Sequence, residues 1–122
     1  MSRVRPDPVV HLELHTGNLG RACAFYSELA GWRAEHVRLG SRSYVALDLG
    51  PGCSGGVVEC GSANAVWLPY VEVADVERMT RRAVELGASV MLGPREGPAG
   101  WRSGVAAPEG GEIGLWQPKR RA

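Results

Sequence analysis

Residues Val9 to Gly31 read VVHLELHTGNLGRACAFYSELAG, and their pattern predicts a strand that leads directly into a helix. From Val9 to Thr16 apolar and polar residues alternate, which is the periodicity of a strand with one buried face. The alternation places Leu12 and Leu14 on one face. The opposite face carries three polar side chains: His11, Glu13 and His15. A sheet that buries the leucines therefore leaves this polar row on its other face.

The helix that follows has sequence signals at both ends. Asn18 is a preferred N-cap residue, because its side-chain oxygen can accept a hydrogen bond from a free N–H group of the first turn. We expect the helix to run from Leu19 to Ala30 and to end at Gly31, since glycine tolerates the left-handed conformation common at helix C-termini. The i, i+3, i+4, i+7 spacing predicts a buried stripe: Ala22, Phe25, Tyr26 and Leu29.

The same order of elements occurs twice along the chain. After the first helix, turn residues separate three segments with strand character: Trp32 to Val37, Tyr44 to Leu49 and Gly56 to Cys60. The pattern then restarts with a strand from Val66 to Val73, an N-cap at Asp75, a helix from Val76 to Leu86 and a stop at Gly87. Three further strands complete the second half: Ser89 to Leu92, Ser103 to Ala107 and Glu112 to Trp116.

This internal repeat predicts the fold class. We expect a single α+β domain over residues 1–122, with one βαβββ module at about residues 9–60 and a second at about residues 66–117. A unit of this kind cannot bury its own hydrophobic face, so such units stack against each other. The two modules are therefore expected to form a curved mixed sheet around a cleft. The polar row of the first strand should line that cleft.

Composition excludes several classes of protein. The chain has 122 residues, a net charge of +1 and 44% hydrophobic residues, which suits one soluble domain. It lacks the long apolar run of a membrane span, the apolar region of a secretory signal, and the basic excess of a nucleic-acid-binding protein. Three cysteines (Cys23, Cys53 and Cys60) form neither an even set nor a CxxC pair. We expect a reduced, cytoplasmic protein with no membrane and no nucleic-acid partner.

The order and spacing of several motifs resemble the vicinal oxygen chelate superfamily. This superfamily includes glyoxalase I, extradiol dioxygenases, and bleomycin and fosfomycin resistance proteins. The resemblance spans about Val9 to Pro118. Its most specific parts are His11 with Asn18, the Phe25-Tyr26 and Gly31-Trp32 pairs, and the segment Pro108 to Ile113. The resemblance implies the paired βαβββ fold and, for members that bind a ligand without chemistry, a homodimer with two equivalent clefts.

Catalytic members of this superfamily hold a divalent metal with four residues, two from each module. Carried over by position, the first module matches with His11 on its first strand and Glu59 on its last. The second module has Leu68 and Gly114 at the corresponding positions, and neither can coordinate a metal. We therefore expect no metal cofactor, with His11 and Glu59 as residual ligand positions. The same two residues are the candidates for acid–base catalysis.

Strand parity extends the expected ligand-binding face beyond the polar row. On the middle strand of the first module, Tyr44 and Asp48 lie on this face. In the second module the face includes Leu68 and Tyr70 on the first strand, and Gly114 and Trp116 on the last strand. Gly114 is expected to leave a gap beside the aromatic rings. Trp101 is expected on a loop, where it either covers the cleft or anchors the loop in a solvent-shielded position. The expected ligand-binding residues are His11, Glu13, His15, Tyr44, Asp48, Glu59, Leu68, Tyr70, Trp101, Gly114 and Trp116.

Two functions from different classes fit this set of residues. The first is a metal-independent binding protein that sequesters an aromatic or polyketide-like compound, as in antibiotic self-resistance, because aromatic rings and a few polar groups suit a flat ligand. The second is an enzyme that uses His11 and Glu59, either a metal-dependent lyase, isomerase or dioxygenase, or a metal-free isomerase or cyclase. The scaffold hosts unrelated functions, so the ligand cannot be named from the fold.

Overall fold

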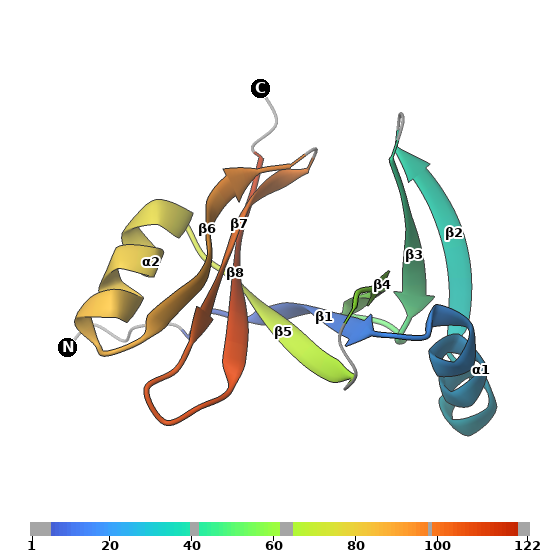
Figure 1. The fold of residues 1–122 in the computed structure, drawn as a ribbon. Helices are drawn as coiled ribbons and strands as arrows, with labels where there is room; N and C mark the ends of the chain where they lie inside the picture. The colour runs from blue at the N-terminus through green and yellow to red at the C-terminus, as the bar shows by residue number, and fades with distance from the viewer. Residues whose placement is uncertain (1–5, 40–41, 62–64, 98, 120–122) are drawn as a thin grey trace. The chain divides into compact units, whose positions relative to one another are not determined.

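The structure is a computed structural model that describes residues 6–39, 42–61, 65–97 and 99–119. It divides into two compact units, Val10–Leu68 and Met1–Val9 with Pro69–Ala122. Each half of the chain has the predicted order of a strand, a helix and three strands (Figure 1). The predicted α+β class is confirmed. The cleft and the pairing of two chains stay predictions.

The unit Val10–Leu68 is a four-stranded mixed sheet with one helix. Its strand order is β2-β3-β4-β1, in which β1 and β4 are parallel and the other pairs antiparallel. The elements are β1 (Val9–Thr16), α1 (Leu19–Ala30), β2 (Arg33–Leu39), β3 (Arg42–Asp48) and β4 (Ser54–Glu59). Strand residues that face α1 form the core: Leu14, Val45, Leu47 and Val57. Alternation along each strand then fixes which side chains lie on the face away from the helix.

The unit containing Pro69–Ala122 repeats this arrangement. Its strand order is β5-β8-β7-β6, with β5 and β8 parallel and the other pairs antiparallel. The elements are β5 (Val66–Glu72), which begins in the other unit, α2 (Val76–Glu85), β6 (Ser89–Glu96), β7 (Gly100–Ala106) and β8 (Glu112–Pro118). Helix α2 lies along one face of this sheet (Figure 1), where Val73, Val76 and Leu115 form the core.

The predicted bounds of α1 and the predicted start of α2 are confirmed, whereas α2 ends at Glu85, one residue before the predicted Leu86. Asn18 accepts a hydrogen bond from the N–H of Arg21 at 3.0 Å, and Asp75 accepts one from the N–H of Arg78 at 3.1 Å. Both are N-caps that satisfy a first-turn donor. Gly31 has a φ of 71°, the left-handed conformation that ends α1.

The predicted buried stripe of α1 is wrong for two of its four members. Phe25 is 57% exposed and Leu29 is 69% exposed. The residues that pack against the core are instead Leu19, Ala22, Cys23 and Tyr26. This set has the same i, i+3, i+4, i+7 spacing, rotated around the helix axis. The prediction failed because α1 is apolar over more than one face, so the spacing alone did not identify the buried side.

Two tryptophans that could have lined a ligand site belong to the core of this unit. Trp67 donates a hydrogen bond from Nε1 to the Tyr26 hydroxyl at 3.1 Å. The Trp32 ring stacks on Tyr26, and Trp67 meets both rings edge-on. Trp32 and Trp67 therefore have a structural role in this core.

None of the helices in the described part of the chain has the length and apolar character needed to cross a membrane.

Candidate functional site

The polar row of β1 lies on the face of its sheet away from α1, as predicted, because alternation puts it opposite Leu14, which belongs to the core beneath α1. Glu13 stands between two imidazoles. Its Oε1 atom lies 2.7 Å from Nε2 of His15, and its Oε2 atom lies 3.5 Å from Nε2 of His11. All three side chains are mostly buried, with exposed fractions of 27% for His11, 13% for Glu13 and 31% for His15. The row is therefore a hydrogen-bonded unit and not three independent surface groups.

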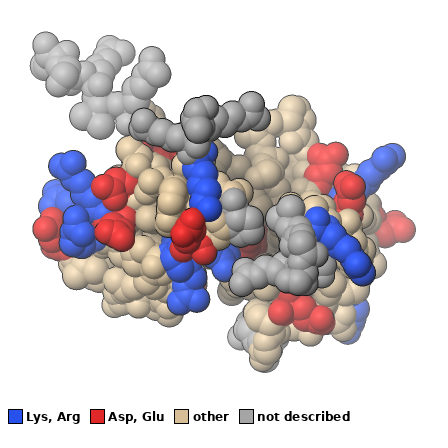
Figure 2. Space-filling view, turned by 90° about the horizontal axis from the view of Figure 1, so that it is seen from above, with Lys and Arg blue, Asp and Glu red and all other residues tan. Residues whose placement is uncertain are grey.

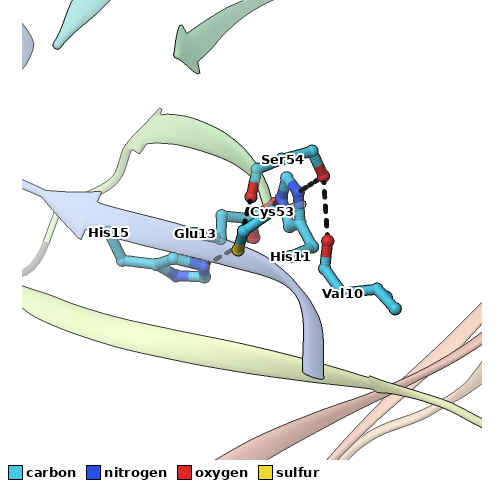
Figure 3. Close-up of polar contacts among 6 residues, drawn as sticks. All are labelled: Val10, His11, Glu13, His15, Cys53 and Ser54. Carbon is cyan, nitrogen blue, oxygen red and sulfur yellow. Dashed lines mark hydrogen bonds and ion pairs between the residues drawn. The ribbon is translucent and has the colours of Figure 1, made fainter. Parts of the chain in front are cut away.

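The row continues onto β4 through a residue that sequence reasoning missed. Ser54 Oγ lies 2.7 Å from Nδ1 of His11 and also donates to the Val10 carbonyl at 3.3 Å. Ser54 was missed because β4 was expected to begin at Gly56. Continuing the alternation back by two residues and pairing β4 with β1 in parallel would have found it. A chain of contacts thus runs from Ser54 through His11 and Glu13 to His15 (Figure 3).

The two histidines keep Glu13 ionised. Burial raises the pKa of this carboxyl, but the hydrogen bonds and charges of His11 and His15 outweigh burial and lower the pKa from 4.5 to about 2. Glu13 is therefore an anion across the physiological range. A fixed carboxylate can orient an imidazole or accept a hydrogen bond from a ligand hydroxyl or amine.

Small residues lie beside the row, next to an exposed aromatic ring. Glu13 is in register with Gly56 on β4, which is in register with Ala46 on β3. The His11 ring lies over Gly56, where an added Cβ would be 3.4 Å from two ring atoms. Tyr44 is on the same face as Ala46, two residues along β3, and is 44% exposed. Two interstrand spacings, about 10 Å, separate β3 from β1. Between them, the register places Val58, 38% exposed, in the row of Tyr44 and His15.

Two further residues assigned to this face have structural contacts. Asp48 accepts a hydrogen bond from the N–H of Gly50 at 3.0 Å, which closes the turn after β3. Glu59 was expected beside His11, and this pairing is wrong. In the parallel register His11 is opposite Ser54 and Glu59 is opposite Thr16. Five residues of strand, about 16 Å, separate the two positions.

Glu59 instead stabilises the start of α1. Its Oε1 atom accepts from the N–H of Leu19 at 3.3 Å. In the other unit Gln117 accepts from the N–H of Val76 at 2.9 Å, so each unit uses the end of its last strand to satisfy the first residue of its helix. Glu59 thus corresponds to Gln117 in the repeat, whereas sequence spacing had aligned it with Gly114.

The residues present do not fit the metal site of the catalytic superfamily members. The β4 residues nearest His11 are Ser54 and Gly56, which offer no carboxylate or imidazole. Among the described residues, no group of three or more His, Cys, Asp and Glu side chains is arranged to hold a metal. Tight binding of a transition metal needs three or four such donors.

In the second unit the expected gap at Gly114 is filled. Tyr70 on β5 is 6% exposed, and Leu68, the β5 residue that ends the other unit, is 9% exposed. The Tyr70 ring lies against Gly114, where an added Cβ would be 2.5 Å from ring carbons. Trp116 lies over Gly100 in the same way and is half-buried. Gly114 therefore provides close packing for Tyr70 and not an opening for a ligand.

The expected position of Trp101 on a loop is also wrong. Trp101 belongs to β7 and packs against the core beneath α2, on the other face of its sheet from Trp116. The segment around it contains four glycines between residues 93 and 104, which suggested a loop. The β6–β7 pairing instead extends to Glu96 opposite Trp101.

On the surface face seen in Figure 2, basic and acidic side chains are interspersed, unlike a phosphate-binding surface.

Comparisons with known proteins agree with this fold. The family model described as a glyoxalase-like domain matches residues 11–116. The anthracycline biosynthesis protein DnrV of Streptomyces peucetius is 32% identical over 108 residues, which cover 86% of this chain and 39% of DnrV. The chain thus spans less than half the length of the named relatives it matches.

Solved structures share the fold at low sequence identity. A hypothetical protein from Bacillus halodurans is 13% identical with a TM-score of 0.69, covering 97% of this chain and 99% of that protein. Methylmalonyl-CoA epimerase of Streptomyces coelicolor, in complex with 2-nitronate-propionyl-CoA, is 15% identical with a TM-score of 0.61, covering 92% of this chain and 97% of the epimerase. At these identities the similarity concerns the fold alone.

Proposed function

Because the chain belongs to the glyoxalase-like domain family of the vicinal oxygen chelate superfamily, we propose that it binds a small, flat, aromatic or polyketide-like molecule without a metal. In this proposal the protein sequesters the molecule that it binds, as in antibiotic self-resistance. The proposed binding surface is the face of the β2-β3-β4-β1 sheet opposite α1.

One observation carries the proposal: an ionised carboxylate and an exposed tyrosine lie on the same face of the sheet, two strands apart. Glu13 is in one row across the strands with Gly56 and Ala46. Tyr44 is in the adjacent row, in which the register places Val58 and His15. Aromatic stacking on Tyr44 would hold the plane of the ligand, and hydrogen bonds to Glu13 or His11 would set its orientation. Flat polyketides with hydroxyl groups have both features.

The relatives support this ligand class. DnrV is named for anthracycline biosynthesis, and anthracyclines are fused-ring aromatic compounds. The structure of the epimerase with an acyl-CoA analogue supports small-molecule binding by this fold. The proposal for this chain concerns ligand chemistry and not the activity of either whole protein.

Calorimetric titration with an anthracycline tests the proposal through Tyr44→Ala. Loss of one stacking ring, worth about 0.5–1.5 kcal/mol, predicts up to about tenfold weaker binding. Phe25→Ala is the matched control, because Phe25 is an exposed aromatic residue on α1, which covers the opposite face. Equal affinities of wild type and Tyr44→Ala would remove the proposed surface.

An enzyme is the second candidate, favoured by the contacts of His11. Ser54 holds Nδ1 of His11 at 2.7 Å and Glu13 lies 3.5 Å from its Nε2, an arrangement that orients an imidazole for proton transfer. In this enzyme hypothesis Glu13, and not Glu59, is the carboxylate that acts together with His11. It predicts that His11→Ala abolishes conversion of a bound ligand, followed by mass spectrometry, while the ligand still binds. Unchanged ligand after prolonged incubation with wild type would contradict it.

The cellular setting follows from the same reasoning. We propose a cytoplasmic homodimer, because three cysteines remain unpaired in the described residues and non-catalytic superfamily members pair two chains. Sedimentation equilibrium gives the oligomeric state directly. A monomer at micromolar concentration would refute the dimer.

A further inference from the structure

A cavity of about 440 Å³ lies within the unit Pro69–Ala122, at the amino end of α2. Its walls come from the first residues of α2, the end of β6, and Trp101 on β7. Trp101 packs beneath α2, so the cavity is on the helix face of its sheet, unlike Tyr70 and Gly114. The volume is within the range of small-molecule sites.

The lining is acidic and contains one aromatic ring. Of its nine residues three are acidic (Asp75, Glu77 and Glu96) and one, Arg95, is basic. Acidic residues therefore outnumber basic ones in the lining by three to one, which favours a cation over an anion.

The amino end of α2 does not favour an anion here. The N–H of Val76 already donates to Gln117 at 2.9 Å, and the N–H of Arg78 donates to Asp75 at 3.1 Å. Two carboxylate residues, Asp75 and Glu77, flank the remaining first-turn groups. An anionic ligand would meet satisfied donors and like charges.

The chain itself places an ammonium group at the edge of this cavity. Lys119 Nζ lies 5.6 Å from the centre of the Trp101 ring and 2.7 Å from Oε2 of Glu96. The face of an aromatic ring attracts an ammonium ion through the ring quadrupole, and a carboxylate beside it adds the attraction of an opposite charge. The Lys119 side chain is 37% exposed and Glu96 is 61% exposed, so solvent screens this pair and a competing cation can displace the lysine.

We propose that this cavity binds small molecules bearing a primary or substituted ammonium group, and that Lys119 occupies the ammonium position until such a ligand displaces it. The Trp101 ring and the Glu96 carboxylate would contact the cation. The apolar part of the ligand would lie along Pro94 and the body of the indole. The ligand thus competes with a tethered side chain. Its apparent affinity equals its intrinsic affinity multiplied by the fraction of molecules in which the lysine has left the ammonium position.

The sequence offers a selective probe of this competition. Lys119 is the only lysine among the 122 residues, so protein labelled with lysine carrying ¹³C at Cε alone gives a single lysine side-chain NMR signal. The ring current of Trp101 should move this signal from its position in urea-unfolded protein. Titration with 2-phenylethylammonium should return it toward the unfolded position, whereas the uncharged analogue 2-phenylethanol should not. Equal effects of the two compounds, or a native signal at the unfolded position, would overturn the proposal.

Variants test the same competition through affinity. Lys119→Met, which keeps the apolar stem, should bind 2-phenylethylammonium at least threefold more tightly, because the internal competitor is gone. Glu96→Gln should bind it at least threefold more weakly. Glu85→Gln is the matched control, since Glu85 pairs with Arg82 at the far end of α2 and is 65% exposed. Unchanged affinity in Lys119→Met would overturn the proposal without touching the ligand site proposed on the other unit.

Discussion

Replacement of Glu13 by glutamine should alter the pH dependence of stability. Glu13 has a folded-state pKa of about 2, against 4.5 for the ordinary side chain. Because the folded pKa is the lower one, this carboxylate stabilises the fold above pH 4.5. The contribution is lost as the pH falls from 4.5 through 2. A difference of about 2.5 pKa units corresponds to roughly 3 kcal/mol.

Urea unfolding at pH 6.5, 4.5, 3 and 2 measures this contribution. The free energy of unfolding of wild type should fall between pH 4.5 and 2 by up to about 3 kcal/mol more than that of Glu13→Gln. Glu85→Gln serves as control for the loss of one exposed carboxylate. If wild type and Glu13→Gln lose stability in parallel over this range, the two histidines do not hold Glu13 as described.

Two further substitutions test packing and buried hydrogen bonding in the second unit. Gly114→Ala should destabilise by about 1–3 kcal/mol, because the new Cβ would meet the Tyr70 ring at 2.5 Å, whereas Gly93→Ala on β6 meets nothing within 4 Å. Thermal unfolding that ranks the two alanine variants equally would contradict the close contact. Thr80→Val should cost about 1–3 kcal/mol, because it leaves Ser103, 1% exposed, without its 2.7 Å hydroxyl partner. Thr80→Ser should restore the hydrogen bond. If urea unfolding shows that Thr80→Ser is no more stable than Thr80→Val, this explanation is contradicted.

The fold was predictable because local signals agree with one another along most of the chain. Alternation located β1, a capping asparagine and a terminal glycine bounded α1, and the repeat of both signals around Asp75 indicated the second unit. The errors have local causes. In the segment before Trp101 glycines suggested a loop, yet cross-strand pairing with β7 continues to Glu96 through two irregularities of register.

The candidate site was predictable only in part, because strand register is not a local property. Parity correctly placed His11, Glu13 and His15 on one face. It could not show that β4 begins at Ser54 and runs parallel to β1, which puts Ser54 and not Glu59 beside His11. If a strand is misplaced by an even number of residues, each side chain stays on the same face of the sheet; an odd shift moves it to the other face. Either shift changes the residues that lie opposite it on the neighbouring strand. The role of Glu59 at the start of α1 follows from the register and the backbone contact together.

Calorimetric titration of chelator-treated protein with an anthracycline, repeated after addition of Zn²⁺, tests metal-independent ligand binding most directly. We predict saturable binding in the presence of chelator, with an affinity that added metal does not change. The absence of binding, or binding that appears only after metal is added, would contradict the proposed function.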